Sequence, residues 1–186
     1  VSNLDTNHQP LAREDRRRLF NLGNQLWHSD SSFRAIPAKY SILSGRITVD
    51  KGGRTEFADM RAAYDALDAR TKADIEDLIC EHSLLYSRGT LGFSDLSPAE
   101  KALFKPVRQR LVRTHPVTGR KALFVNRNFT TRIVGLKKHE SDALLDMLYR
   151  HSETPEFQCR FVWQPNSIAF WDNRAAMHHE AALKFR

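Results

Sequence analysis

The chain has 186 residues, of which 41% are hydrophobic and 27% are charged, a composition typical of one globular domain with a single core. Its 29 Lys and Arg residues against 22 Asp and Glu residues give a formal net charge of +7. The basic residues occur in short, interrupted groups that are not interleaved with aromatic residues. This pattern disfavours a nucleic-acid surface and favours a small anionic substrate.

Three further features bear on the compartment. No segment comes near the roughly 18 consecutive apolar residues of a membrane-spanning helix, so we expect no membrane span. The N-terminal segment lacks the apolar core of a signal peptide, and Cys80 and Cys159 show no CxxC spacing. We therefore expect a cytoplasmic protein without a disulfide framework or a zinc finger. The sequence leaves the oligomeric state open, and a homo-oligomer is one option.

The N-terminal part of the chain predicts a helix, an extended segment, a strand and a turn. Apolar residues at helical spacing over 13–24 predict a helix that Gly23 can end. The next segment, 25–33, alternates polar residues with their neighbours and is predicted to be extended. Branched residues over 39–49 predict a strand, and paired glycines within 50–55 predict a turn with positive φ.

The central part of the chain predicts helices. Residues 55–85 form the longest region of helical spacing, in which Thr71 can cap a second helix. Another helix is expected to start at Ser97, with Pro98 in its first turn and Glu100 completing a capping box.

The C-terminal part of the chain returns to strands. Residues 108–126 predict two strands around a Pro/Thr/Gly turn, and 139–152 predicts an amphipathic helix. Residues 156–179 predict two strands around a turn at 164–167, followed by a third extended piece. Strands near both ends with helices between them indicate a mainly β core, closed by the first and last strands, with helices outside.

His28 and Asp30 give the first chemical signal. On a strand, residues i and i+2 point to the same face, so the imidazole and the carboxylate would be presented together. A catalytic metal needs a third ligand, and His178 or His179 is the best donor. Two histidines and one carboxylate with open coordination positions are diagnostic of non-haem Fe(II) oxygenases. By itself the pair is a weak signal, because most such pairs are solvated or belong to a core.

Four blocks of sequence are more specific. In chain order they read "WHSDSSF", "GGRTEFADMRAAYDAL", "LFVNRNFTTRIVGL" and "WQPNSIAFWDNRAAMHH". Together they resemble the taurine dioxygenase and 2,4-dichlorophenoxyacetate dioxygenase family of Fe(II)/2-oxoglutarate-dependent enzymes, from about Asp15 to His179. The resemblance implies a double-stranded β-helix, or jelly roll, with helical insertions. It also implies that residues 1–186 form a single catalytic domain, incomplete at both ends.

The resemblance implies ligands for the metal and the cosubstrate. His28, Asp30 and His178 match the three iron ligands of the family. Thr55 matches the threonine whose hydroxyl binds a carboxylate of 2-oxoglutarate. Arg186 is the candidate for the arginine that clamps the far carboxylate, although it lies closer to the distal histidine than in the family pattern.

The resemblance also implies substrate contacts. Asn24 and Ser87 match positions that hold the acidic group of the substrate in taurine dioxygenase. Phe33 and Phe129 match aromatic residues of the pocket wall, and core packing is an equal alternative for both.

Five neighbouring residues are given structural interpretations. Arg88 and Arg127 are interpreted as solvated surface charges, and Trp171 as packing near the iron. Asp172 and Asn173 are interpreted as fixing the turn that leads to the distal ligand.

The function implied by the resemblance is that of a dioxygenase. It would use Fe(II), 2-oxoglutarate and O₂, release succinate and CO₂, and oxidise a C–H bond, by default to an alcohol. A sulfonate, a phenoxyacetate or an amino acid would fit as substrate, because different blocks are closer to different branches of the family. Two alternatives are a metal-dependent hydrolase with a His/Asp/His site and a non-enzymatic jelly-roll binding protein.

Overall fold

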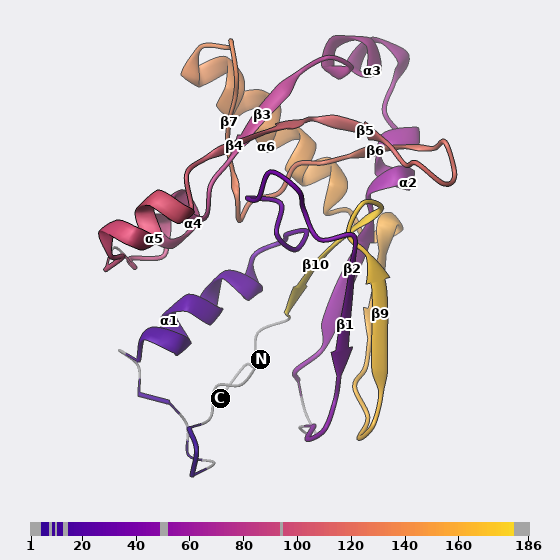
Figure 1. The fold of residues 1–186 in the computed structure, drawn as a ribbon. Helices are drawn as coiled ribbons and strands as arrows, with labels where there is room; N and C mark the ends of the chain where they lie inside the picture. Colours follow the sequence, from indigo (N-terminus) through magenta and orange to yellow (C-terminus); the bar gives the residue numbers. More distant parts are fainter. Residues whose placement is uncertain are drawn as a thin grey trace.

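The computed structural model of the chain describes residues 5–7, 9, 11–12, 15–48, 52–93 and 95–180 (Figure 1). The predicted cosubstrate clamp Arg186 lies outside these residues, as does part of the turn expected at 50–55. The two glycines of that turn, Gly52 and Gly53, have φ angles of 81° and 60°, as expected.

Two antiparallel sheets join early and late segments of the chain. One sheet pairs β1 (Tyr40–Ser44) with β9 (Ile168–Asp172). The other has the order β10 (Ala176–Glu180), β2 (Thr55–Asp59), β8 (Gln158–Phe161). Figure 1 shows β1, β2, β9 and β10 running along one another at one end of the molecule. The expectation that the first and last strands come together is confirmed.

The other two sheets come from the middle of the chain. In the first, β3 (Ile79–His82) lies between β4 (Val107–Arg110) and β7 (Thr130–Ile133). The second is a hairpin of β5 (Val112–Thr114) and β6 (Lys121–Leu123), which confirms the predicted pair of strands around a Pro/Thr/Gly turn. The described residues thus form a mainly β structure with helices, as predicted.

The helices flank these sheets. The described helical segments are α1 (Arg16–Asn21), the 3₁₀ helix η1 (Leu22–Gln25), α2 (Met60–Asp65), α3 (Ala69–Ile75), α4 (Leu84–Thr90), α5 (Pro98–Leu103), α6 (Lys138–Ser152) and the 3₁₀ helix η2 (Pro155–Phe157). The predicted capping box of α5 is present, since the Ser97 side chain accepts from the Glu100 backbone while the Glu100 carboxylate accepts from the Ser97 backbone. The predicted amphipathic helix is α6.

The prediction of helical structure throughout 55–85 was wrong in two places. The first residues of this region form β2, the central strand of its sheet, because β10 and β8 satisfy the hydrogen bonds of β2 from both sides. Residues 79–82 form β3, and the last two residues of the region begin α4. The second helix is capped by Asp68 and not by Thr71, whose backbone N–H donates to the Asp68 carboxylate.

The extended segment predicted over 25–33 is also different from expectation. Only His28 pairs in a β fashion, through an isolated bridge to His178. The chain then turns, with Ser32 N–H donating to the Ser29 carbonyl and Ser31 at a φ of 58°. The left-handed backbone at Ser31 is incompatible with a continuing strand.

The core lies between the central sheets and helices α2 and α6. Its buried members include Met60, Ile75, Leu111, Ile133 and Leu148. Each such side chain contributes about 1.5–3 kcal/mol through the removal of its apolar surface from water. Both cysteines are free. In the described part of the chain, no helix combines the length and the apolar character that crossing a membrane requires.

Candidate metal centre

Two histidines are brought side by side by backbone pairing. His28 N–H donates to the His178 carbonyl at 2.9 Å, and His178 N–H donates to the His28 carbonyl at 2.8 Å. The two imidazole rings have centroids 4.3 Å apart. Because β10 is itself held by β2, the bridge fixes His28 against a three-stranded sheet.

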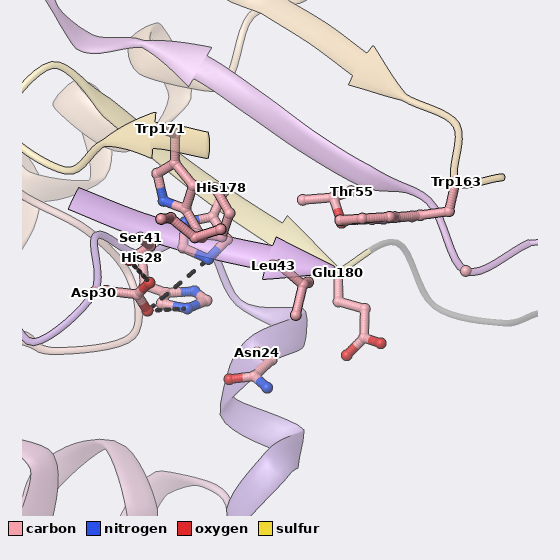
Figure 2. A pocket seen from close by; sticks show the side chains of 12 residues that line it. Asn24, His28, Asp30, Ser41, Leu43, Thr55, Trp163, Trp171, His178 and Glu180 are labelled. Atoms are coloured by element: carbon pink, nitrogen blue, oxygen red, sulfur yellow. Dashed lines mark hydrogen bonds and ion pairs between the residues drawn. The ribbon is translucent and has the colours of Figure 1, made fainter. Parts of the chain in front are cut away.

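Asp30 completes a cluster of three possible metal ligands. Its Oδ1 lies 3.6 Å from His28 Nε2 and 4.0 Å from His178 Nε2 (Figure 2). One ligand atom from each residue falls within 4.8 Å of the others. The predicted proximity of these side chains is therefore observed, but the turn after His28 positions the carboxylate, and strand alternation does not.

The protonation of the histidines suits metal binding. His28 Nδ1 lies 2.7 Å from the Leu26 carbonyl, which can only accept, so Nδ1 carries the proton and Nε2 keeps its lone pair. Burial lowers the pKa of His28, and the nearby Asp30 carboxylate opposes this. Burial and the neighbouring His28 lower the pKa of His178 well below its ordinary value. Both imidazoles are thus neutral near pH 7, the form that binds metals.

The second carboxylate oxygen of Asp30 is held away from the histidines. Asp30 Oδ2 accepts a hydrogen bond of 2.5 Å from the Ser41 hydroxyl, which in turn accepts from Asn173 Nδ2 at 2.8 Å. The Asn173 side-chain oxygen accepts from the Asp30 backbone N–H at 3.2 Å and from Trp171 Nε1 at 3.0 Å. Asn173 therefore orders the turn at Asp30, whereas its predicted role was in the turn that leads to His178, and Asp30 can present one oxygen to a metal.

A cavity of about 320 Å³ opens beside the cluster. Its lining residues are Asn24, His28, Asp30, Ser41, Ile42, Leu43, Gly53, Thr55, Trp163, Trp171, His178 and Glu180. Figure 2 shows Thr55 at some distance from His28 and Asp30 in this cavity, with Trp171 packed by His178. The structure thus places two further predicted site residues, Asn24 and Thr55, with the three possible ligands.

Three predicted substrate contacts lie behind the cavity wall. Phe129 is 3% exposed and contacts the His28 ring edge-on, with centroids 5.9 Å apart, while Phe33 packs on Phe129 at 4.8 Å. Ser87 is fully buried, and its hydroxyl bonds to the Asn128 side-chain oxygen. None of the three lines the described cavity.

The interpretation of Arg88 as a solvated surface charge was wrong. Its side chain lies under the Phe20 ring, with the guanidinium carbon 4.2 Å from the ring centroid, and it is 4% exposed. Gly23 makes this possible, since a Cβ there would lie 2.2 Å from Arg88 Nη1. Burial lowers the pKa of Arg88 to about 10. Arg127 is a part-exposed residue, and it pairs with Glu153 at 2.7 Å.

Sequence reasoning missed six of the lining residues, which are Ser41, Ile42, Leu43, Gly53, Trp163 and Glu180. Ser41 and Leu43 lie on the same, less exposed face of β1, a pattern that the predicted strand could have supplied once the cavity face was known. Trp163 follows β8, and Glu180 ends β10 opposite Thr55. Their positions depend on pairings between distant strands, which leave no local signal.

Comparison with known proteins gives consistent matches. A family model described as "Taurine catabolism dioxygenase TauD, TfdA family" matches residues 3–184. The chain is 42% identical over 178 residues to the alpha-ketoglutarate-dependent 2,4-dichlorophenoxyacetate dioxygenase of Cupriavidus pinatubonensis, covering 96% of this chain and 62% of that protein. It is 40% identical over 162 residues to the (S)-phenoxypropionate/alpha-ketoglutarate-dioxygenase of Sphingobium herbicidovorans, covering 84% of this chain and 56% of that protein.

A solved structure is similar over the same extent. The crystal structure of AAD-2 in complex with Mn(II) and N-oxalylglycine matches with a TM-score of 0.90 and 56% sequence identity. The match covers 96% of this chain and 64% of that one. The chain thus spans less than two thirds of the length of each of these relatives.

Proposed function

The chain belongs to the TauD/TfdA family of dioxygenases, and we propose that it catalyses the Fe(II)- and 2-oxoglutarate-dependent oxidation of a C–H bond in a small anionic substrate. The observation that carries this proposal is the cluster of His28, Asp30 and His178 on a cavity that also contains Thr55. Two neutral imidazoles and one carboxylate match the donor set of non-haem Fe(II) oxygenases.

In this proposal the hydrogen bonds of His28 and Asp30 determine which atom of each residue binds the metal. His28 binds through Nε2, because its Nδ1 proton is committed to the Leu26 carbonyl. Asp30 binds through Oδ1, because Ser41 occupies Oδ2. When bound with 2-oxoglutarate, Fe(II) supplies the activation of O₂ that yields succinate, CO₂ and the oxidised substrate. The triad carries one negative charge, so a divalent ion leaves the site positive and favours a dianionic cosubstrate.

The remaining cavity residues bind and orient. The Thr55 hydroxyl donates to a carboxylate of 2-oxoglutarate, and the far clamp remains the predicted role of Arg186. Ile42, Leu43 and Trp171 give part of the cavity an apolar lining that suits an aromatic ring. Asn24 offers an amide to a polar group of the substrate.

The substrate class follows from these contacts and from the relatives. The names of two relatives specify a phenoxyacetate and a phenoxypropionate, both small aryloxy carboxylates. We therefore place phenoxyalkanoates first, and a sulfonate, as in the yeast sulfonate dioxygenase that is 35% identical over 155 residues, second. Ser87, Phe33 and Phe129 keep their predicted substrate roles only if the wall between them and the cavity rearranges.

We also propose the family's double-stranded β-helix as the fold. Pairing of β1 with β9 and of β2 with β10 supports this, since both sheets join strands from opposite ends of the chain. Relatives of the same family support it as well.

The proposal is tested by anaerobic titration of the apo-protein with Fe(II) and 2-oxoglutarate, followed by visible absorption. A weak charge-transfer band that requires both components is expected. His28→Ala and Asp30→Ala should abolish the band, whereas His139→Ala, an exposed histidine of α6, should retain it. Retention of the band in His28→Ala would exclude this site. Substrate turnover with zinc and without 2-oxoglutarate would support a hydrolase instead.

A further inference from the structure

Thr55 and Trp163 form a hydrogen bond inside the cavity. The indole Nε1–H of Trp163 donates to Thr55 Oγ1 at 2.9 Å (Figure 2). Thr55 is 6% exposed, and it pairs with Phe161 at the end of the β2–β8 ladder. Trp163 follows Phe161 by two residues, so the end of β8 carries the indole onto the threonine.

The bond determines where the threonine proton can point. A hydroxyl has one proton and two lone pairs, whereas an indole N–H can only donate. Trp163 therefore occupies a lone pair of Thr55 and leaves its proton to another acceptor. Within the described residues, no acceptor for that proton is found. Glu180 pairs with Thr55 across the β10–β2 ladder, but Figure 2 shows its side chain directed away from the Thr55 hydroxyl.

We propose that Trp163 is a positioning residue that makes Thr55 a dedicated hydrogen-bond donor to a carboxylate of the cosubstrate. This inference rests on the proposed function, because it assumes that 2-oxoglutarate binds at Thr55. Without Trp163, the Thr55 hydroxyl could rotate and donate its hydrogen bond to water or to a carbonyl. With Trp163, the proton is directed to a ligand that accepts, and an anion accepts most strongly.

The indole is held in place from two sides. The Phe161 ring packs edge-on against Trp163, with centroids 4.8 Å apart. On another side lies Gly45, the residue after β1, where a Cβ would sit only 2.9 Å from Trp163 Cε3. The Gly45 backbone is itself fixed, since its N–H donates to the Ser167 carbonyl at 2.8 Å. A donor that is fixed before the ligand arrives loses little freedom on binding.

The competing explanation is that Trp163 only fills space. Trp163→Phe separates the two roles, because it keeps an aromatic ring and removes the N–H. The assay is the dissociation constant of 2-oxoglutarate for the Fe(II)-loaded protein, from the anaerobic charge-transfer titration. We expect Trp163→Phe to weaken binding by roughly 3–10-fold, the effect of one neutral hydrogen bond. Thr55→Val, which removes the hydroxyl, should weaken it by roughly 10–100-fold.

A double-mutant cycle decides between the two explanations. If Trp163 acts through the hydroxyl, Trp163→Phe has no further effect in the Thr55→Val background. Equal loss in both backgrounds would mean packing alone and would overturn the inference. Trp27→Phe is the matched control, since it removes an indole N–H outside the cavity lining and should leave the constant unchanged.

Two further measurements keep the outcome interpretable. Gly45→Ala moves the indole without altering its N–H or Thr55, and it should weaken 2-oxoglutarate binding; unchanged binding would count against the inference. Fe(II) affinity without 2-oxoglutarate should be the same in wild type and Trp163→Phe, because neither residue of the pair is a proposed ligand. Failure of the wild type to bind 2-oxoglutarate would refute the proposed function, whereas a normal wild type with an unaffected Trp163→Phe would refute only the role of Trp163.

Discussion

The Ser41 hydroxyl donates a hydrogen bond to Oδ2 of Asp30, the carboxylate oxygen that does not face the histidines. The substitution Ser41→Ala tests what this hydrogen bond contributes. The Ser41–Asp30 bond is 2.5 Å long and has an ionised acceptor, a class that contributes about 1.5–3 kcal/mol. Removal of a hydrogen-bond partner of a metal ligand typically weakens metal binding by about 10–100-fold. We expect Ser41→Ala to weaken Fe(II) binding within that range, because the carboxylate is then free to rotate.

The same substitution should also lower stability. Asn173 is 2% exposed and donates to Ser41 at 2.8 Å, so the variant leaves a buried amide donor without its partner. An unsatisfied buried donor costs about 1–3 kcal/mol of folding free energy. Chemical denaturation of the metal-free protein measures this loss, separately from the metal titration.

Calorimetric titration with Mn(II), a redox-stable substitute for Fe(II), measures the affinity. Ser44→Ala is the matched control, because Ser44 lies on the same strand, β1, and is exposed. The reasoning is refuted if Ser41→Ala and Ser44→Ala bind Mn(II) equally well. A fall in stability with unchanged affinity would mean that Ser41 supports the fold and not the ligand.

Three other predictions concern stability. Burial lowers the pKa of His82 from 6.5 to about 3, so below about pH 6.5 the unfolded chain binds a proton that the folded chain does not. Stability should fall with decreasing pH over this range, by up to about 1.4 kcal/mol per pH unit, and His82→Gln should reduce that slope in denaturation curves measured from pH 7 to pH 5. Leu148→Ala should cost about 2–5 kcal/mol and Leu103→Ala, at an exposed site, less than about 0.5 kcal/mol, as measured by urea denaturation. Gly23→Ala should lose about 1–3 kcal/mol by overpacking against Arg88, and an Arg88→Ala background should remove most of this loss; an equal loss in both backgrounds would contradict the proposed clash.

Local signals in the sequence were sufficient wherever the structure is determined locally. The capping box at Ser97 and Glu100 is a contact between near neighbours, so its residues predict it directly. Helix α6 has an apolar face long enough to reveal its period, and the hairpin of β5 and β6 has its turn residues in place. In all three cases the interacting residues are close to one another in the sequence.

The wrong predictions concern residues whose structure depends on contacts with segments far away in the sequence. Residues Thr55–Asp59 precede a helix and share its apolar spacing, and only pairing with β10 and β8 makes them a strand. Arg88 carries no local sign of burial, because the ring above it and the space for it come from Phe20 and Gly23. A single sequence does not contain these pairings in a form that periodicity can detect.

The cluster of possible ligands combines both kinds of information. His28 and Asp30 are near neighbours, and their type and spacing drew attention to them, although a turn at Ser31 brings them together where a strand was expected. His178 reaches them only through its backbone bridge to His28, at the edge of a sheet that pairs β10 with β2. Since the β2 strand also carries Thr55, the same pairing that completes the cluster of possible metal ligands places the Thr55 hydroxyl, the proposed contact of the cosubstrate, on the same cavity. A change that disrupts the β2–β10 pairing should therefore impair metal and cosubstrate binding together, whereas changes at Ser41 or Trp163 should separate them.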